Sequence, residues 1–233
     1  MKKMKQYKWT VISCGMLADE VKQEWERVQP DARLLWMKRG LHNSPQTLRT
    51  GVQAMIEEHQ DCEAILLTYG LCGNGTCGLV SPHTKLVVPA FHDCIHQLLH
   101  DVDKDREKES SSWKKKMQTG HYYLTRGWTL DEEAIYQQSC LILRKYGEER
   151  GKSILREMYH GYTDMDVIET GAYDMAPVLE YAAKAARINP MKVNSVKGST
   201  DVLHKLLTGN WDQDFIVLDP GEELTLQHFL MHV

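Results

Sequence analysis

Three cysteines, Cys14, Cys72 and Cys94, each follow a short apolar segment of the chain. The three segments are rich in branched residues and are followed by Gly, Pro or polar residues, which is typical of buried β-strands. In an alternating order of strands and helices the strands pair in parallel, and ligands bind outside their carboxyl ends. We therefore expect the three thiols to converge on one edge of a sheet. The segments are 10–13, 64–69 and 86–89.

Thiolates are ligands for zinc, iron and iron–sulfur clusters, so Cys14, Cys72 and Cys94 suggest a metal site. His42 precedes a predicted helix that starts at Pro45, which places it near the same edge. As a fourth ligand His42 would close a tetrahedral site; as a nearby acid or base it would leave the metal an open position. Zinc is the first choice and a four-iron cluster is the alternative. The alternative to a metal site is that the three cysteines are small buried residues that only pack in the core.

His92 and Asp93 directly precede Cys94 and are candidates for catalysis together with His42. Metal sites depend on hydrogen bonds to their ligands, so this pair could orient Cys94 or relay a proton. The same residues could equally cap the helix that we expect at 95–100. His96, inside that helix, is expected to be a surface or packing residue.

The segment 69–78 contains four glycines and two cysteines. Glycine lets the backbone approach a ligand and adopt positive φ, so Gly73, Asn74 and Gly75 are candidates for substrate binding. An oxyanion or phosphate nest is one form that such a segment takes. Its spacing matches neither a Walker loop nor the dinucleotide fingerprint, so nucleotide binding is not indicated.

The aromatic segment 120–128, which we expect to be extended, supplies two further candidates for substrate binding. Tyr123 could stack on a planar ligand, and the guanidinium of Arg126 suits a carboxylate or phosphate. Core packing for Tyr123 and a surface salt bridge for Arg126 are the alternatives.

The composition is that of an ordinary globular protein, with 233 residues, 42% hydrophobic residues, 26% charged residues and a net charge of -4. This charge does not suggest nucleic-acid binding. No apolar stretch of about 18 residues is present, so neither a signal peptide nor a membrane span is supported, and we expect a cytoplasmic protein. Six cysteines in such a chain favour metal binding or thiol chemistry over disulfides.

The order of elements predicts an α/β fold with two Rossmann-like parallel-sheet halves. We expect a first half at 1–100 with the cysteine-rich edge, and a second half at 161–233. Between them, 101–160 would hold a charged loop or lid, the aromatic segment and a helical connector. Similar segments in the two halves suggest a duplication, with a cleft between the halves. The predicted strands are 9–13, 33–37, 64–69, 85–89, 166–169, 192–196 and 214–218, and the predicted helices are 17–28, 45–59, 95–100, 175–187 and 199–208.

Several of these motifs together resemble the family called domain of unknown function 1638, over residues 10–219. The resemblance implies an α/β protein of anaerobes and methanogens that use corrinoid methyl transfer, and it supplies no reaction. It carries over Cys14, His42, Cys72 and Cys94, whereas Cys77 falls where the family is expected to accept another residue. The motifs are Cys14-Gly15, Leu41-His42-Asn43, 69–75, His92-Asp93-Cys94-Ile95, 122–125 and Gly127-Trp128.

The function that we expect is an enzyme acting on a small molecule at a Cys/His metal site. A metal-dependent transferase or lyase, linked to methyl or sulfur transfer, fits this chemistry, with a corrinoid methyltransferase-system protein as the partner. One alternative is a protein that binds and delivers a corrinoid or another cofactor, although the Asp-x-His-x-x-Gly cobalamin motif is missing from the sequence. Another alternative is a metal-free thiol sensor.

Overall fold

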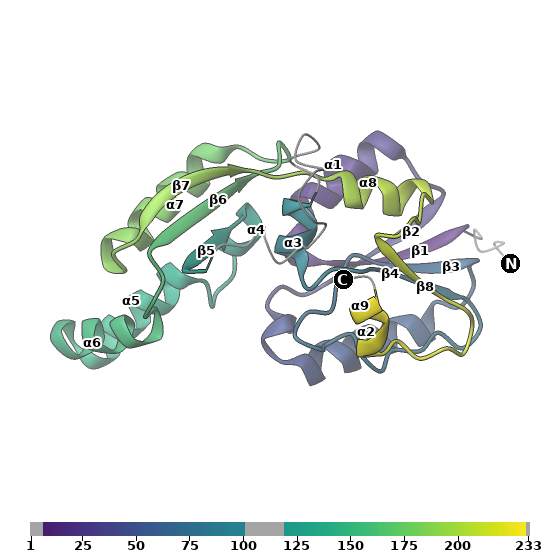
Figure 1. Cartoon of the computed structure of the whole chain (residues 1–233), viewed down its shortest axis with the longest axis horizontal. Coiled ribbons are helices and arrows are strands. Elements are labelled where there is room, and N and C mark those ends of the chain that lie inside the picture. Colours follow the sequence, from purple (N-terminus) through teal and green to yellow (C-terminus); the bar gives the residue numbers. More distant parts are fainter. Residues whose placement is uncertain (1–6, 101–118, 232–233) are drawn as a thin grey trace, which may run out of the picture. The chain divides into compact units, whose positions relative to one another are not determined.

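The computed structural model describes residues 7–100 and 119–231 (Figure 1). The chain forms two compact units, one made of Met1–Trp113 with Ser199–Val233 and the other of Lys114–Gly198. We call them the first and the second unit. The charged loop expected at 101–116 lies outside the described residues.

The first unit is built on a five-stranded sheet with the order β2-β1-β3-β4-β8. The first four strands of this order are parallel, and β8 is antiparallel to β4. The chain leaves β1 toward β2 on one side and later returns as β3 on the other side, which is the arrangement that opens a ligand site between the ends of β1 and β3. The strands are β1 (Trp9–Cys14), β2 (Ala32–Met37), β3 (Ala64–Leu67), β4 (Lys85–Pro89) and β8 (Phe215–Leu218).

Helices cover both faces of this sheet, which explains why β1, β3 and β4 read as nearly continuous apolar runs. Helices α1 and α8 lie on one face and α2 on the other (Figure 1). On the α8 side, Val202 and Leu206 belong to one core cluster with Val11, Leu66 and Val87 of the sheet. The helices of the first unit are α1 (Ala18–Val28), α2 (Pro45–Glu58), α3 (Cys94–Leu99), α8 (Asp201–Thr208) and α9 (Leu226–Met231), with two short 3-10 helices at Gly15–Leu17 and Leu41–Asn43.

The second unit has a three-stranded parallel sheet with the order β5-β6-β7. One face of this sheet packs against α5 and α7, where Met165 and Val167 of β6 meet Val178 and Ala182 of α7. The elements are β5 (His121–Leu124), α4 (Arg126–Thr129), α5 (Ile135–Tyr146), α6 (Glu148–Met158), β6 (Asp164–Glu169), α7 (Met175–Ile188) and β7 (Lys192–Lys197).

These two sheets confirm the expected α/β class with two parallel-sheet halves. The division of the chain differs from the expected one, because residues 199–233 belong to the first unit and not to a second half at 161–233. Strand β8 pairs with β4, and a hydrogen bond between the His204 ring and the Glu24 carboxylate joins α8 to α1. A strand's sequence does not specify which sheet it joins.

The structure confirms one element that the local sequence predicted and corrects another. Helix α2 begins at Pro45 as expected, and the Ser44 side chain accepts a hydrogen bond from the backbone N–H of Thr47 over 3.4 Å. The segment expected to be extended over 120–128 is a strand only to Leu124, because Arg126 begins the short helix α4. Among the described residues, no helix is both long and apolar enough to cross a membrane.

Candidate functional site

Cys14 is the last residue of β1 and lies directly before the 3-10 helix that leads into α1. Its backbone N–H donates to Oγ1 of Thr68 over 2.9 Å, which joins the end of β1 to the segment that follows β3. Burial raises the pKa of the Cys14 thiol, while the backbone N–H groups of Met16 and Leu17 and the charge of Arg39 act in the opposite direction. A thiol that faces the free N–H groups of a helical turn has partners for its thiolate form.

Cys72 lies in the loop that follows β3, and Cys94 is the first residue of α3, directly after the loop that follows the neighbouring strand β4. The backbone N–H of Leu71 donates to the carbonyl oxygen of Phe91, and that of Cys72 to the carbonyl oxygen of His92, each over 2.8 Å. Gly70 permits this approach, because a Cβ at that position would lie 2.2 Å from the Phe91 carbonyl oxygen. The two loops therefore continue the pairing of their strands.

Cys72 has an unusual backbone conformation, with a φ of 47°. Gly73 and Asn74 follow with φ of 63° and 67°, so three successive residues are left-handed. A left-handed conformation costs about 1–2 kcal/mol for a residue with a side chain. Strain of this kind persists where the surrounding structure imposes it, and it concentrates at functional sites.

The three thiols interact electrostatically with one another. Desolvation is the largest cause that raises the pKa of Cys72, and the charge of Cys14 is the next. Burial raises the pKa of Cys94 well above its usual range, with the charges of Cys14, Asp93 and Cys72 acting in the same direction. Cys14 is only 7% exposed, and the residues Cys72 and Cys94 are partly exposed, although protein atoms surround their thiols. The structure thus brings the three cysteines to one edge of the sheet.

Tyr69 lies among these thiols and is 2% exposed. Burial raises the pKa of its hydroxyl, and the charges of Cys14, Cys72 and Cys94 add to the effect. A side-chain hydrogen bond links this hydroxyl to the thiol of Cys14, where it raises the pKa of Tyr69 and lowers that of Cys14. Sulfur is a weak hydrogen-bond partner, so this buried hydroxyl is less well satisfied than most.

Two charged side chains also act on the thiols. Arg39 follows β2, and its positive charge lowers the pKa of Cys14. Glu20, fully buried on α1, carries a negative charge that raises the pKa of Cys94. The site therefore has a cation near one thiol and a carboxylate near another.

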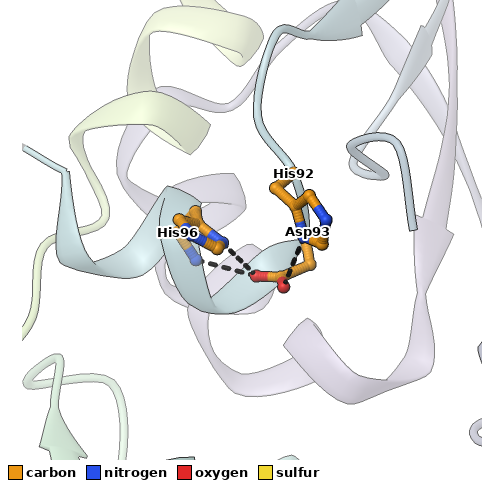
Figure 2. A group of neighbouring side chains, drawn as sticks. All are labelled: His92, Asp93 and His96. Atoms are coloured by element: carbon orange, nitrogen blue, oxygen red, sulfur yellow. Dashed lines mark hydrogen bonds and ion pairs between the residues drawn. The ribbon is translucent and has the colours of Figure 1, made fainter. Parts of the chain in front are cut away.

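Asp93 connects two imidazoles at the start of α3 (Figure 2). Its Oδ1 accepts from the backbone N–H of His96 over 3.0 Å and lies 2.8 Å from Nδ1 of His96, while its Oδ2 lies 3.2 Å from Nδ1 of His92. Burial acts to raise the pKa of Asp93, but the hydrogen bonds from His92 and His96 outweigh it and hold the pKa below its usual range. The hydrogen bond with Asp93 raises the pKa of His92.

This group of His92, Asp93 and His96 could itself hold a cation, because one ligand atom from each residue lies within 4.8 Å of the others. Within the described residues, Cys14, Cys72 and Cys94 do not form a group that compact. However, Oδ1 of Asp93 already caps α3 and binds the imidazole of His96. The arrangement suits residues that fix the position of Cys94 and handle a proton beside it.

Asp93 therefore caps α3, as one of the two alternatives expected, and it also pairs with two histidines, as a residue that orients Cys94 or relays a proton would. His96 is not the unpartnered surface or packing residue that we expected, because its ring pairs with Asp93. His42 lies on the 3-10 helix before α2, and it is not among the main groups that shift the pKa values of the three thiols.

The residues predicted to bind substrate are not among the main groups that shift the pKa values of the three thiols. Gly75 is buried, and a Cβ there would lie 2.7 Å from a methyl carbon of Leu48, so packing accounts for this glycine. The carbonyl oxygen of Asn74 accepts from the Arg49 guanidinium over 2.9 Å. Tyr123 and Arg126 belong to the second unit, the former buried on β5 and the latter half-buried at the start of α4.

Sequence reasoning missed Tyr69, Arg39, Glu20 and His96 as members of the site. The sequence could have identified Tyr69 and Arg39, because each lies two residues beyond a strand that ends at this edge. Glu20 has a weaker signal, because a single carboxylate on an amphipathic helix normally faces water.

Comparisons with curated proteins and with solved structures found no match to this chain. The sequence profile of a family described as a protein of unknown function (DUF1638) matches residues 36–207, which is more than half of the chain. The matched range contains His42, Cys72 and Cys94, and Cys14 precedes it. On this match, the chain belongs to the DUF1638 family.

Proposed function

We propose that the protein binds a thiolate-preferring metal through Cys14, Cys72 and Cys94 and acts there as an enzyme on a small molecule. One observation carries the proposal: the thiols of Cys14, Cys72 and Cys94, which follow or end three neighbouring strands, are near enough that the charge of Cys14 raises the pKa values of the other two. The hydrogen bond from Cys72 to the carbonyl oxygen of His92 holds together the segments that follow two of these strands.

A metal cation matches the chemistry of these groups. Three desolvated thiols stay protonated without a counter-charge, and a metal ion replaces the protons and offsets the repulsion between thiolates. Zinc is the first choice. It needs sulfur atoms about 3.8 Å apart for Zn–S bonds of about 2.3 Å, so the loops would have to move together. A four-iron cluster spans a wider set of thiolates and is the alternative.

A metal held by three thiolates would supply an open position that activates a substrate thiol or polarises an oxygen. Asp93 fixes the start of α3, and with it Cys94, through its hydrogen bonds with His96. His92 is exposed and its pKa is raised by Asp93, so it is suited to donate a proton to a substrate. Methyl or sulfur transfer by a transferase or lyase fits these groups, with a corrinoid methyltransferase-system protein as the partner.

A thiol sensor without a metal would use the same cysteines. The thiolate is the reactive form, and desolvation raises the pKa values of all three thiols above the usual range of cysteine. The thiolate fraction at neutral pH is then low, which argues against this alternative.

The test is the zinc and iron content of protein purified without oxygen, measured by mass spectrometry for the wild type and two variants. Cys72→Ala should lose the metal. Cys62→Ala is the matched control, because the Cys62 thiol faces the carbonyl oxygens of His59 and Ala64, away from this cluster. About one zinc per chain supports a mononuclear site, and about four irons with visible colour support a cluster. No metal in the wild type, or equal metal in Cys72→Ala, would refute the proposal.

A further inference from the structure

Arg39 lies close to Cys14 because their strands are neighbours. In the parallel pair of β1 and β2, Cys14 is opposite Met37, so Arg39 follows two residues beyond the shared edge. The next residue after Cys14 is Gly15, where a Cβ would lie 3.1 Å from Cγ of Arg39 and 2.8 Å from the Met37 carbonyl oxygen. The absence of a side chain at Gly15 thus lets the Arg39 stem pack against the residue next to Cys14, and the charge of Arg39 acts on the Cys14 thiol.

Arg39 has no anionic partner in the described part of the chain. Its Nε is buried without a hydrogen-bond partner, and no described carboxylate forms an ion pair with it, although the residue is half-buried. Arg33 of the same strand shows the usual arrangement, with two hydrogen bonds to the carboxylate of Asp61, of 3.2 and 2.9 Å. Desolvation of an unpaired guanidinium is unfavourable, so Arg39 is in place for an anion that the chain itself does not supply.

We propose that Arg39 binds an oxyanion group, a carboxylate or a phosphate, of the small molecule that reaches the thiols. A planar guanidinium recognises either group through two parallel hydrogen bonds. This inference rests on the proposed function, because it assumes that the rest of the small molecule binds at Cys14, Cys72 and Cys94. Anion binding by Arg39 does not itself require the metal.

The test is an NMR titration of the whole chain with inorganic phosphate and, separately, with acetate, at constant ionic strength so that screening does not change. The wild type should show saturable shifts around Cys14 and Gly15. Arg39→Gln should weaken this binding at least tenfold. Lys38→Gln is the matched control, since it removes the same charge from the exposed neighbouring residue and should bind as the wild type does.

The stronger of the two probes identifies the oxyanion as carboxylate or phosphate. Arg39→Lys keeps the charge but not the planar fork, so it should bind with intermediate strength, and it remains informative if Arg39→Gln does not fold. Wild-type protein without saturable binding, or Arg39 variants that bind as tightly as the wild type, would overturn the inference. The titration is repeated on metal-free protein, where anion binding by Arg39 should persist, so failure of the metal proposal is recognised separately.

Discussion

The backbone N–H of Cys72 donates to the carbonyl oxygen of His92 over 2.8 Å, beyond the ends of the two strands that precede them. This bond places the loop of Cys72 beside the segment that contains Asp93 and Cys94. Two of the three thiols are thus positioned by a continuation of the sheet and not by a disulfide, since all six cysteines are free. The site depends on how closely these loops approach each other.

Gly70→Ala should separate the loops. The added Cβ would meet the Phe91 carbonyl oxygen at 2.2 Å, and the backbone must shift to relieve this contact. We expect a loss of about 3 kcal/mol in the free energy of unfolding, measured with urea, and a loss of bound metal. Gly221→Ala is the control, because its Cβ meets nothing within 4 Å and only its positive φ causes strain, of about 1 kcal/mol. Wild-type stability in Gly70→Ala would mean that the loops are not held this closely.

Tyr69→Phe should leave the stability unchanged or increase it slightly. The substitution removes a buried hydroxyl together with its side-chain hydrogen bond to the Cys14 thiol, which is a weak partner, so the lost bond and the removed desolvation penalty should nearly cancel. The change in the free energy of unfolding should stay within about 1 kcal/mol of zero. Destabilisation by about 2 kcal/mol or more would show instead that the hydroxyl has a stronger partner than the thiol of Cys14.

Asp214→Asn tests how the last strand is attached to the first sheet. Asp214 directly precedes β8 and lies between His100 and Lys205. Burial acts to raise the pKa of Asp214, but the hydrogen bonds from His100 and Lys205 outweigh it and hold the pKa at about 2. A depressed carboxyl pKa stabilises the folded state above the ordinary pKa of the group, and this contribution is lost as the pH falls through the folded value.

We therefore expect Asp214→Asn to lower the free energy of unfolding at neutral pH by on the order of 2 kcal/mol. The difference from the wild type should shrink as the pH falls from about 4 toward about 2. Asp219→Asn is the control, because its pair with Lys85 is exposed and such pairs contribute about 0–1 kcal/mol. A difference that stays constant over this pH range would contradict the role assigned to the carboxylate.

The sequence alone predicted the strand-end position of all three thiols. Apolar runs before Cys14, Cys72 and Cys94 identify buried strands, and parallel pairing then brings their ends together. The start of α2 at Pro45 was equally predictable, because a capping serine and a proline are local signals. Long-range partners have no such local signal.

Three features of the structure were not predictable for that reason. The antiparallel attachment of β8 depends on which sheet has a free edge, and the strand's own residues do not encode it. The burial of Glu20, whose charge acts on Cys94, depends on how α1 packs, and its sequence pattern is that of a solvated residue. The contact of Arg39 with the position of Gly15 depends on the register of β1 and β2.

Above all, we propose that Cys14, Cys72 and Cys94 bind a metal. The most direct test is the X-ray absorption fine structure above the edge of the bound metal, which gives the number and type of its ligand atoms. We predict about three sulfur atoms at about 2.3 Å, from Cys14, Cys72 and Cys94. A shell of nitrogen and oxygen atoms without sulfur would contradict this claim and would place the metal at His92, Asp93 and His96 instead.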